Sequence, residues 1–172
     1  FKQKTAYEIR NCDWSSDVCS SDLAGRRRIR AGLAVLQQQK LVDAHRIAAI
    51  GYCFGGTSVL ELARSGADVA GVVSFHGGLA TPLPAKAGEV KAKVLVCHGA
   101  DDAFESPAEI AAFQQEMREA GADWRMIYYG GALHSFTNPQ SGKFGIPGVA
   151  YNEKADRRSW ADMQQFFAEI FR

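Results

Sequence analysis

The sequence predicts an α/β protein in which a parallel, doubly wound sheet carries helices on both faces. Short apolar runs bounded by turn residues alternate along the chain with longer segments of helical spacing, which is the pattern of strand–helix–strand units. The apolar runs are nearly continuous, as expected of strands buried on both faces. The 172 residues, of which 47% are hydrophobic, suit a globular domain with a sizeable core.

The first half of the chain alternates helix and strand twice. A helix is predicted over Arg26–Leu41, because its apolar residues gather on one broad face: Ile29, Leu33, Val35 and Leu36. His45–Gly51 (HRIAAIG) is a short apolar run between turn signals and is predicted to be a buried strand. Gly55–Ser65 returns to helical spacing, with apolar residues at i, i+3 and i+4, and Val69–Phe75 (VAGVVSF) is a second strand.

The second half continues the alternation. Val90–His98 (VKAKVLVCH) is predicted to be the third strand and Trp124–Tyr129 (WRMIYY) the fourth. Between them Pro107–Ala120 is predicted to be a helix, since Ser106 can cap its first turn and proline fits its first position. Asn152–Phe171 is an amphipathic closing helix. Loops that bear proline or glycine are expected at residues 81–89 and 138–151.

Charge and cysteine usage exclude several classes of protein. The 20 cationic and 19 anionic side chains give a net charge of +1, which argues against a nucleic-acid partner. No run approaches the roughly 18 apolar residues of a membrane-spanning helix, so no membrane partner is expected. Cysteines are too sparse for a disulfide scaffold and lack zinc-ligand spacing, which indicates a reducing, cytoplasmic location. Four arginines within residues 26–30 could bind an anion, but a solvated first helical turn is the preferred interpretation.

The first 23 residues follow no helical or strand period. Lys2–Glu8 (KQKTAYE) and Asp13–Leu23 (DWSSDVCSSDL) resemble the two constant halves of a sequencing-library adapter translated in one frame, with a variable index between them. We therefore expect residues 1–23 to be an artefactual tail. Residues 24–172 are expected to form a partial domain whose natural N-terminal part is missing.

A glycine-rich hexapeptide, Gly51–Gly56 (GYCFGG), lies between a predicted strand and a predicted helix. A nucleophile elbow needs small residues two positions before and after the nucleophile, because its turn is strained and passes close to neighbouring backbone. Gly51 and Gly55 meet this need around Cys53, and the N-terminus of the following helix would favour the reactive thiolate. The alternative is a structural cysteine buried at a strand end.

Two aspartates follow the third predicted strand, in the segment His98–Asp102 (HGADD). A carboxylate at this place can orient an imidazole and stabilise its cationic form. Asp102 is preferred for this role and Asp101 for turn chemistry, while a loop without function is the alternative for both. His98 is expected to fill the core or the turn and not to act as a base.

A histidine follows the fourth predicted strand: His134, in the sequence HSF. An imidazole can take a proton from a thiol and return it to a leaving group near neutral pH. His45 and His76 are expected to be structural, although His76 could also line the site. Nucleophile, acid and histidine thus follow three strand ends in the chain order of α/β-hydrolases, and parallel sheets bind ligands at those ends.

Four segments together resemble the dienelactone hydrolase family: Gly51–Gly56 (GYCFGG), His98–Asp102 (HGADD), His134–Phe136 (HSF) and the closing segment Tyr151–Phe171. The resemblance covers about Arg26 to Phe171. It implies a three-layer α/β-hydrolase-type parallel sheet that lacks its N-terminal strands.

The resemblance also implies a chemistry. Cys53, His134 and Asp102 would form a catalytic triad, and the Phe54 backbone N–H would supply one oxyanion-hole donor, the other coming from an upstream loop. The implied activity is the hydrolysis of a small carboxylic ester or lactone, as by a carboxymethylenebutenolidase, through a thioacyl-enzyme intermediate. No metal and no organic cofactor is implied, and the implied partner is a small-molecule substrate.

Family members that act on dienelactone hold its carboxylate with arginines, whereas this chain has no arginine between His134 and Arg157. Two alternatives stay open: a catalytically inactive truncated fragment, and an acyltransferase that uses the same triad. A thiol redox protein based on Cys53 and Cys97 is disfavoured, because the chain has no C-x-x-C motif and another predicted strand separates the two thiols.

Overall fold

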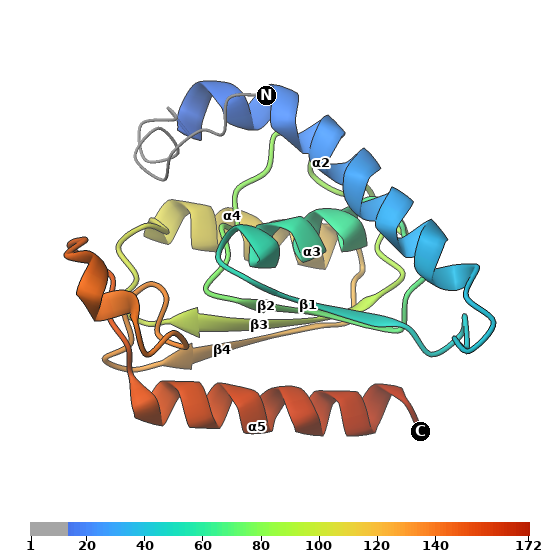
Figure 1. Cartoon of the computed structure of the whole chain (residues 1–172). Coiled ribbons are helices and arrows are strands. Elements are labelled where there is room, and N and C mark those ends of the chain that lie inside the picture. Colours follow the sequence, from blue (N-terminus) through green and yellow to red (C-terminus); the bar gives the residue numbers. More distant parts are fainter. Residues whose placement is uncertain (1–13) are drawn as a thin grey trace, which may run out of the picture.

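A four-stranded parallel sheet forms the middle layer of the computed structural model, which describes residues 14–172 (Figure 1). Its strands lie in the order of the chain and are β1 (Ala48–Tyr52), β2 (Gly71–Phe75), β3 (Lys93–Gly99) and β4 (Trp124–Tyr129). All three neighbouring pairs are parallel. The predicted parallel α/β fold is confirmed, and the carboxyl ends of the four strands meet at one edge of the sheet.

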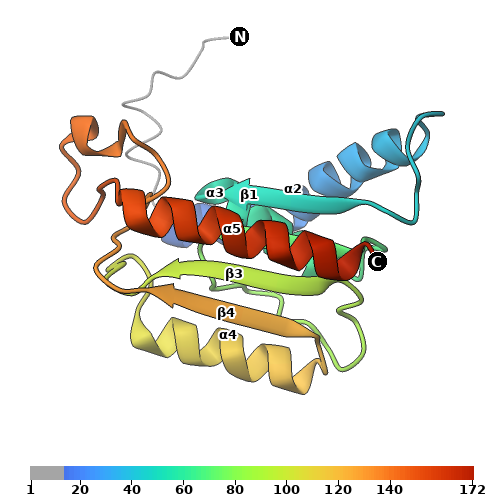
Figure 2. The ribbon, with the colours of Figure 1, turned by 90° about the horizontal axis from the view of Figure 1, so that it is seen from below.

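Helices cover both faces of this sheet (Figures 1 and 2). One face carries α3 (Phe54–Arg64) and α4 (Pro107–Glu119), with α2 (Trp14–Gln37) lying over α3. The other face carries α5 (Glu153–Ile170) alone. The loop before α5 contains a short 3-10 helix, η1 (Ser141–Phe144). Between β1 and the C-terminus, the ends of the predicted strands and longer helices differ from the observed ends by at most three residues.

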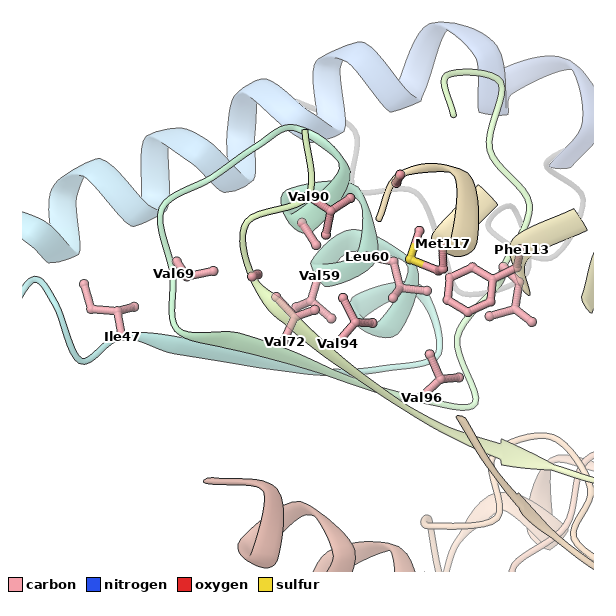
Figure 3. Packing of buried hydrophobic residues seen from close by; sticks show 14 residues of the cluster. Ile47, Val59, Leu60, Val69, Val72, Val90, Val94, Val96, Phe113 and Met117 are labelled. Carbon is pink, nitrogen blue, oxygen red and sulfur yellow. The ribbon is translucent and has the colours of Figure 1, made fainter. Parts of the chain in front are cut away.

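The apolar runs of the sequence are continuous because the central strands contribute to two cores. Val72, Val94 and Val96 point to the α3–α4 side, where they pack with α3 and with Phe113 and Met117 of α4 (Figure 3). Their neighbours in sequence, among them Val73, Leu95 and Cys97, point to the α5 side. Both sets are less than 2% exposed in the strands, so the sheet is a rigid support for the loops at its carboxyl edge.

Helix α2 departs from its prediction at both ends. It begins at Trp14, twelve residues before the predicted start, and ends at Gln37. An amphipathic period reports burial of a face and not helix formation itself, and residues 14–23 contain no glycine or proline to stop a helix. Of the predicted apolar face, Ile29 and Leu33 pack on the core, whereas Val35 and Leu36 are 61% and 42% exposed. The segment Lys2–Glu8 of the predicted tail lies outside the described residues, and the boundary at residue 24 stays a prediction.

The arginines at the start of the predicted first helix are not all solvated, so that interpretation is wrong for Arg26. Its Nε lies 2.5 Å from Glu61 Oε2, and its side chain is 16% exposed. Glu61 also accepts from Arg64, which in turn donates to Glu116 of α4. A buried chain of alternating charges therefore ties α2, α3 and α4 together on the side of the sheet opposite α5.

Candidate active site

Cys53 occupies a strained turn between β1 and α3. Its backbone has φ 50° and ψ −121°, and its thiol is a free thiol. A Cβ on Gly51 would lie 2.0 Å from the Gly55 carbonyl oxygen, and one on Gly56 would lie 2.9 Å from Gly77 Cα. Only glycine fits these positions, because the obstacle is backbone and cannot move aside. The turn has the strained geometry that the hexapeptide predicts for a nucleophile elbow, but the prediction for Gly55 is wrong: a Cβ there would meet nothing within 4 Å, and Gly56 is the second position that requires glycine.

An aspartate and a histidine meet beside this turn. Asp102, in the loop after β3, is buried, and its Oδ2 accepts a 2.9 Å hydrogen bond from Nδ1 of His134, in the loop after β4. The Phe104 amide donates to the other carboxylate oxygen at 3.0 Å. Asp101 is exposed to solvent. Of the two aspartates in the predicted motif, Asp102 is therefore the one in contact with the predicted histidine.

A second histidine lies against the cysteine. His76 directly follows β2, is 1% exposed, and places Nδ1 3.3 Å from Cys53 Sγ and 3.2 Å from the Cys53 amide nitrogen. Its Nε2 lies 2.7 Å from Thr137 Oγ1. The sequence favours a structural role for His76, and the side chain does lie in the core, but it also lines the site. The signal in the sequence is its position directly after the predicted strand Val69–Phe75, and the structure places that strand next to β1.

Residues with a strained backbone lie around the sulfur of Cys53. Within residues 14–172, three non-glycine residues have positive φ: Cys53 at 50°, His76 at 40° and Ser135 at 60°. Ser135 follows His134, and its Oγ lies 3.7 Å from Cys53 Sγ. Such conformations cost on the order of 1–3 kcal/mol each and persist where the surrounding structure holds them, which is common at functional sites. Two of the three strained residues, His76 and Ser135, thus bring their side chains to the sulfur of the third, Cys53.

The electrostatics of the group favour a charged cysteine–histidine pair. Burial opposes ionisation of the thiol, but the interactions with His134 and His76 outweigh it and lower the pKa of Cys53 to about 6. Burial also opposes the imidazolium, yet the hydrogen bonds with Asp102 and Cys53 raise the pKa of His134 to about 9. For Asp102, burial is likewise outweighed by its hydrogen bond with His134, and the pKa of the carboxyl is lowered. Between pH 6 and 9 the pair is thiolate and imidazolium.

Two further titratable residues lie close to this group. Burial raises the pKa of Glu105 to about 7, although its carboxylate accepts from the Leu79 amide at 2.9 Å. Burial lowers the pKa of His98, which is 2% exposed and packs edge-on against Tyr128. His98 therefore fills the core, as its sequence position predicts.

An open cleft of about 480 Å³ leads to the sulfur. Its lining comprises Tyr52, Cys53, His76, Ser135, Thr137, Asn138, Pro139, Asp156 and Trp160. No lysine or arginine belongs to this lining in the part of the chain that the structure describes. Arg157 is exposed and pairs with Glu153 on the surface of α5. The Phe54 amide is the first of α3 and so has no acceptor within the helix, which leaves it free to serve a ligand.

A cysteine on a strand–turn–helix elbow, with an aspartate and a histidine after later strands of one parallel sheet, is the arrangement of an α/β-hydrolase fold. The chain belongs to the dienelactone hydrolase family: the model of the "Dienelactone hydrolase family" matches residues 9–171. The match overlaps the last part of the predicted tail. No helix among residues 14–172 combines the length and the apolar character needed to cross a membrane.

Known proteins of this kind are similar over most of the chain. A Caenorhabditis elegans protein is 37% identical over 147 residues, which is 84% of this chain and 92% of that protein. A solved dienelactone hydrolase-like promiscuous phosphotriesterase from metagenomic libraries is 43% identical, with a TM-score of 0.84 over 94% of this chain and 68% of its own. The solved structure named m3DLH is 41% identical, with a TM-score of 0.89 over 98% of this chain and 70% of its own.

The chain spans about half the length of another relative. A Salmonella typhimurium protein, whose name assigns it provisionally as a carboxymethylenebutenolidase, is 27% identical over 135 residues, 74% of this chain and 47% of that protein. This similarity therefore does not establish the activity, substrate or partners of the whole protein.

Proposed function

We propose that the protein hydrolyses small carboxylic esters or lactones, with Cys53 as nucleophile, His134 as general base and acid, and Asp102 as the residue that orients His134. The observation that carries this proposal is the contact between these side chains. Asp102 Oδ2 accepts from His134 Nδ1 at 2.9 Å, and Cys53 Sγ lies within 4.8 Å of a ring nitrogen of His134. Asp102 holds Nδ1, so Nε2 is the nitrogen left for the thiol.

The proposed reaction proceeds in two halves. The Cys53 thiolate attacks the ester carbonyl, and the Phe54 backbone N–H stabilises the oxyanion that forms. The carbon–oxygen bond then breaks, and the His134 imidazolium gives its proton to the leaving alcohol. Neutral His134 next takes a proton from water, whose oxygen attacks the thioacyl group. The carboxylic acid leaves, and the proton on His134 restores the thiolate–imidazolium pair.

The cleft favours an uncharged substrate. Asp156 contributes a carboxylate to its lining, and the nearest arginine in sequence, Arg157, has an 80% exposed side chain that is paired on the surface. An anionic substrate would meet a like charge and no cation among the described lining residues. We therefore propose neutral esters and lactones, and not carboxylate-bearing dienelactones, as the substrate class.

A p-nitrophenyl acetate assay on the full chain tests the proposal. Cys53→Ala is expected to lower kcat by about 10⁶, and Cys53→Ser is also expected to be poor, because serine does not ionise near neutral pH. Asp102→Asn should lower kcat about 10⁴-fold by favouring the wrong histidine tautomer. Asp101→Asn is the matched control, since its side chain is exposed and should change little. Full activity of Cys53→Ala would overturn the proposal.

The same assay separates the two alternatives. An acyltransferase would give more ester than acid when a short alcohol is added, while a hydrolase would give mainly acid. An inactive fragment would alkylate at Cys53 but turn over no ester. An aryl phosphotriester is a second substrate to assay, because one structurally similar protein is a phosphotriesterase. Free thiols at Cys53 and Cys97 support a reducing compartment, and we propose the cytoplasm.

A further inference from the structure

We infer that Cys53, His76 and His134 form a binding site for Zn²⁺, and that the bound ion blocks the nucleophile. One sulfur and one ring nitrogen from each histidine lie within 4.8 Å of one another. Thiolates and imidazoles are the side chains that zinc prefers, and three protein ligands suffice for sites that keep a fourth position open. Binding follows from geometry alone; only the loss of hydrolysis rests on the proposed function.

The distances suit a tetrahedral ion. Zinc–sulfur and zinc–nitrogen bonds of about 2.3 and 2.0–2.1 Å place the sulfur and a nitrogen about 3.5 Å apart around a tetrahedron. His76 Nδ1 already lies 3.3 Å from Cys53 Sγ. His134, whose ring nitrogen lies within 4.8 Å of the sulfur, needs a shift of about 1.3 Å at most to reach a separation of about 3.5 Å. Three protein ligands leave a fourth position open toward the cleft, as in zinc sites that keep an exchangeable ligand.

Both histidines are already held as zinc ligands usually are. A ligating histidine nearly always gives its other ring N–H to an oxygen, which fixes the tautomer and turns the free nitrogen to the metal. Here His134 Nδ1 donates to Asp102 Oδ2 at 2.9 Å, and His76 Nε2 lies 2.7 Å from Thr137 Oγ1. The Cys53 amide can only donate, so its 3.2 Å contact makes His76 Nδ1 an acceptor and leaves the proton on Nε2. His76 thus turns a lone pair toward the sulfur, and His134 turns its second ring nitrogen there, which becomes a ligand once it gives up its proton.

The cost of admitting the ion is small. Binding replaces the contact between His76 Nδ1 and the Cys53 amide, but that amide keeps the Phe75 carbonyl at 3.1 Å as its acceptor. The charges of the ion, the Cys53 thiolate and the Asp102 carboxylate sum to zero. Cys53 and His134 share one proton in the metal-free protein, and both must be unprotonated to bind, so each ion releases one proton.

Cobalt(II) serves as the spectroscopic probe for the site, followed by zinc competition against a chromogenic chelator. The full chain should bind one Co²⁺ with a thiolate-to-cobalt charge-transfer band, which zinc removes. Cys53→Ser should abolish the band. Thr137→Val should weaken zinc binding 10–100-fold, because it removes the oxygen that holds His76. His76→Gln should weaken it at least as much.

His45→Gln is the matched control, since His45 is exposed and lies outside the cluster. Its zinc affinity should equal that of the unaltered chain. Absence of the charge-transfer band, or zinc affinity that His76→Gln and Thr137→Val leave unchanged, would overturn the inference, with circular dichroism confirming that each variant is folded. In the ester assay, zinc should inhibit and a chelator should restore the rate. Zinc binding without an ester reaction to inhibit would count against the proposed function and not against the site.

Discussion

Replacing His134 by glutamine should raise the pKa of Cys53 from about 6 to about 8, close to the value of an unperturbed thiol. Burial of the thiol favours the neutral form, and the hydrogen bond from His134 is the largest influence that opposes burial. His76 and Ser135 stay in place, so part of the lowering should remain. At pH 7 the ratio of thiolate to thiol would fall from about 10:1 to about 1:10.

Alkylation with iodoacetamide as a function of pH measures this change. Peptide mass spectrometry follows Cys53 separately, and Cys97 is an internal control, since burial raises the pKa of its thiol to about 12. The midpoint of the profile is the quantity to compare, because the intrinsic reactivity of a thiolate also falls as its pKa falls. His45→Gln should keep the midpoint near 6. A midpoint that also stays near 6 in His134→Gln would refute the thiolate–imidazolium interpretation.

The same pair sets the pH dependence of activity and of stability. Activity should rise through pH 6 as the thiolate forms and fall above about 9 as His134 loses its proton. Cys53 has a folded pKa below its unfolded value, so its contribution to stability is present at high pH and is lost as the pH falls through about 6. His134 has a raised folded pKa, so its contribution is present at low pH and is lost as the pH rises through about 9. A thermal-melt series should therefore show the pair's combined stabilisation between these values.

Three further changes test the fold. Arg64→Ala leaves buried Glu116 without its cationic partner, while Glu61 keeps Arg26, and should cost about 3–5 kcal/mol, or about 10 °C in Tm. Arg157→Ala breaks an exposed pair and should cost less than about 0.5 kcal/mol; thermal denaturation compares the two variants. Gly51→Ala puts a methyl group 2.0 Å from backbone and should cost about 3 kcal/mol or more in urea denaturation, while Gly142→Ala has open space and should be nearly neutral. Deleting residues 1–23 should move Tm by less than about 2 °C, because their sequence indicates an artefactual tail, while Arg26, Ile29 and Leu33 attach α2 to α3 and the core; a much larger drop would contradict the predicted boundary.

The sequence predicts a helix or strand accurately where a single local feature, such as burial on both faces or a helix cap, determines it. The strands β2 and β3 were found because burial on both faces makes them continuously apolar. Helix α4 is predicted because Ser106 can cap its first turn and Pro107 fits its first position, and the structure adds the reciprocal bond from Glu109 that completes a capping box. The length of α2 was missed because no apolar stripe marks residues 14–23. Its charged contact to Glu61 was missed because it joins residues 35 apart in the chain.

The sequence likewise predicts some features of the candidate site and does not predict others. Cys53, Asp102 and His134 could be singled out because each follows a strand end, and parallel strands bring their carboxyl ends together. The contact between His76 and the sulfur depends on φ values of 40° and 50° in two turns that face each other. A sequence shows that glycine permits such a turn but does not show where a strained side chain points. His76 was therefore placed near the edge but not against Cys53.

The two histidines beside the sulfur differ in the group that holds the far side of each ring. His134 donates to a carboxylate, whose negative charge stabilises the imidazolium that must form when the thiol gives up its proton. His76 contacts a hydroxyl, which fixes the tautomer but carries no charge to compensate a cation. His76 is thus suited to accept from the Cys53 amide and hold the elbow, and His134 is suited to move the proton. In the proposed mechanism Asp102, and not the distance to the sulfur, therefore favours His134 over His76 as the base.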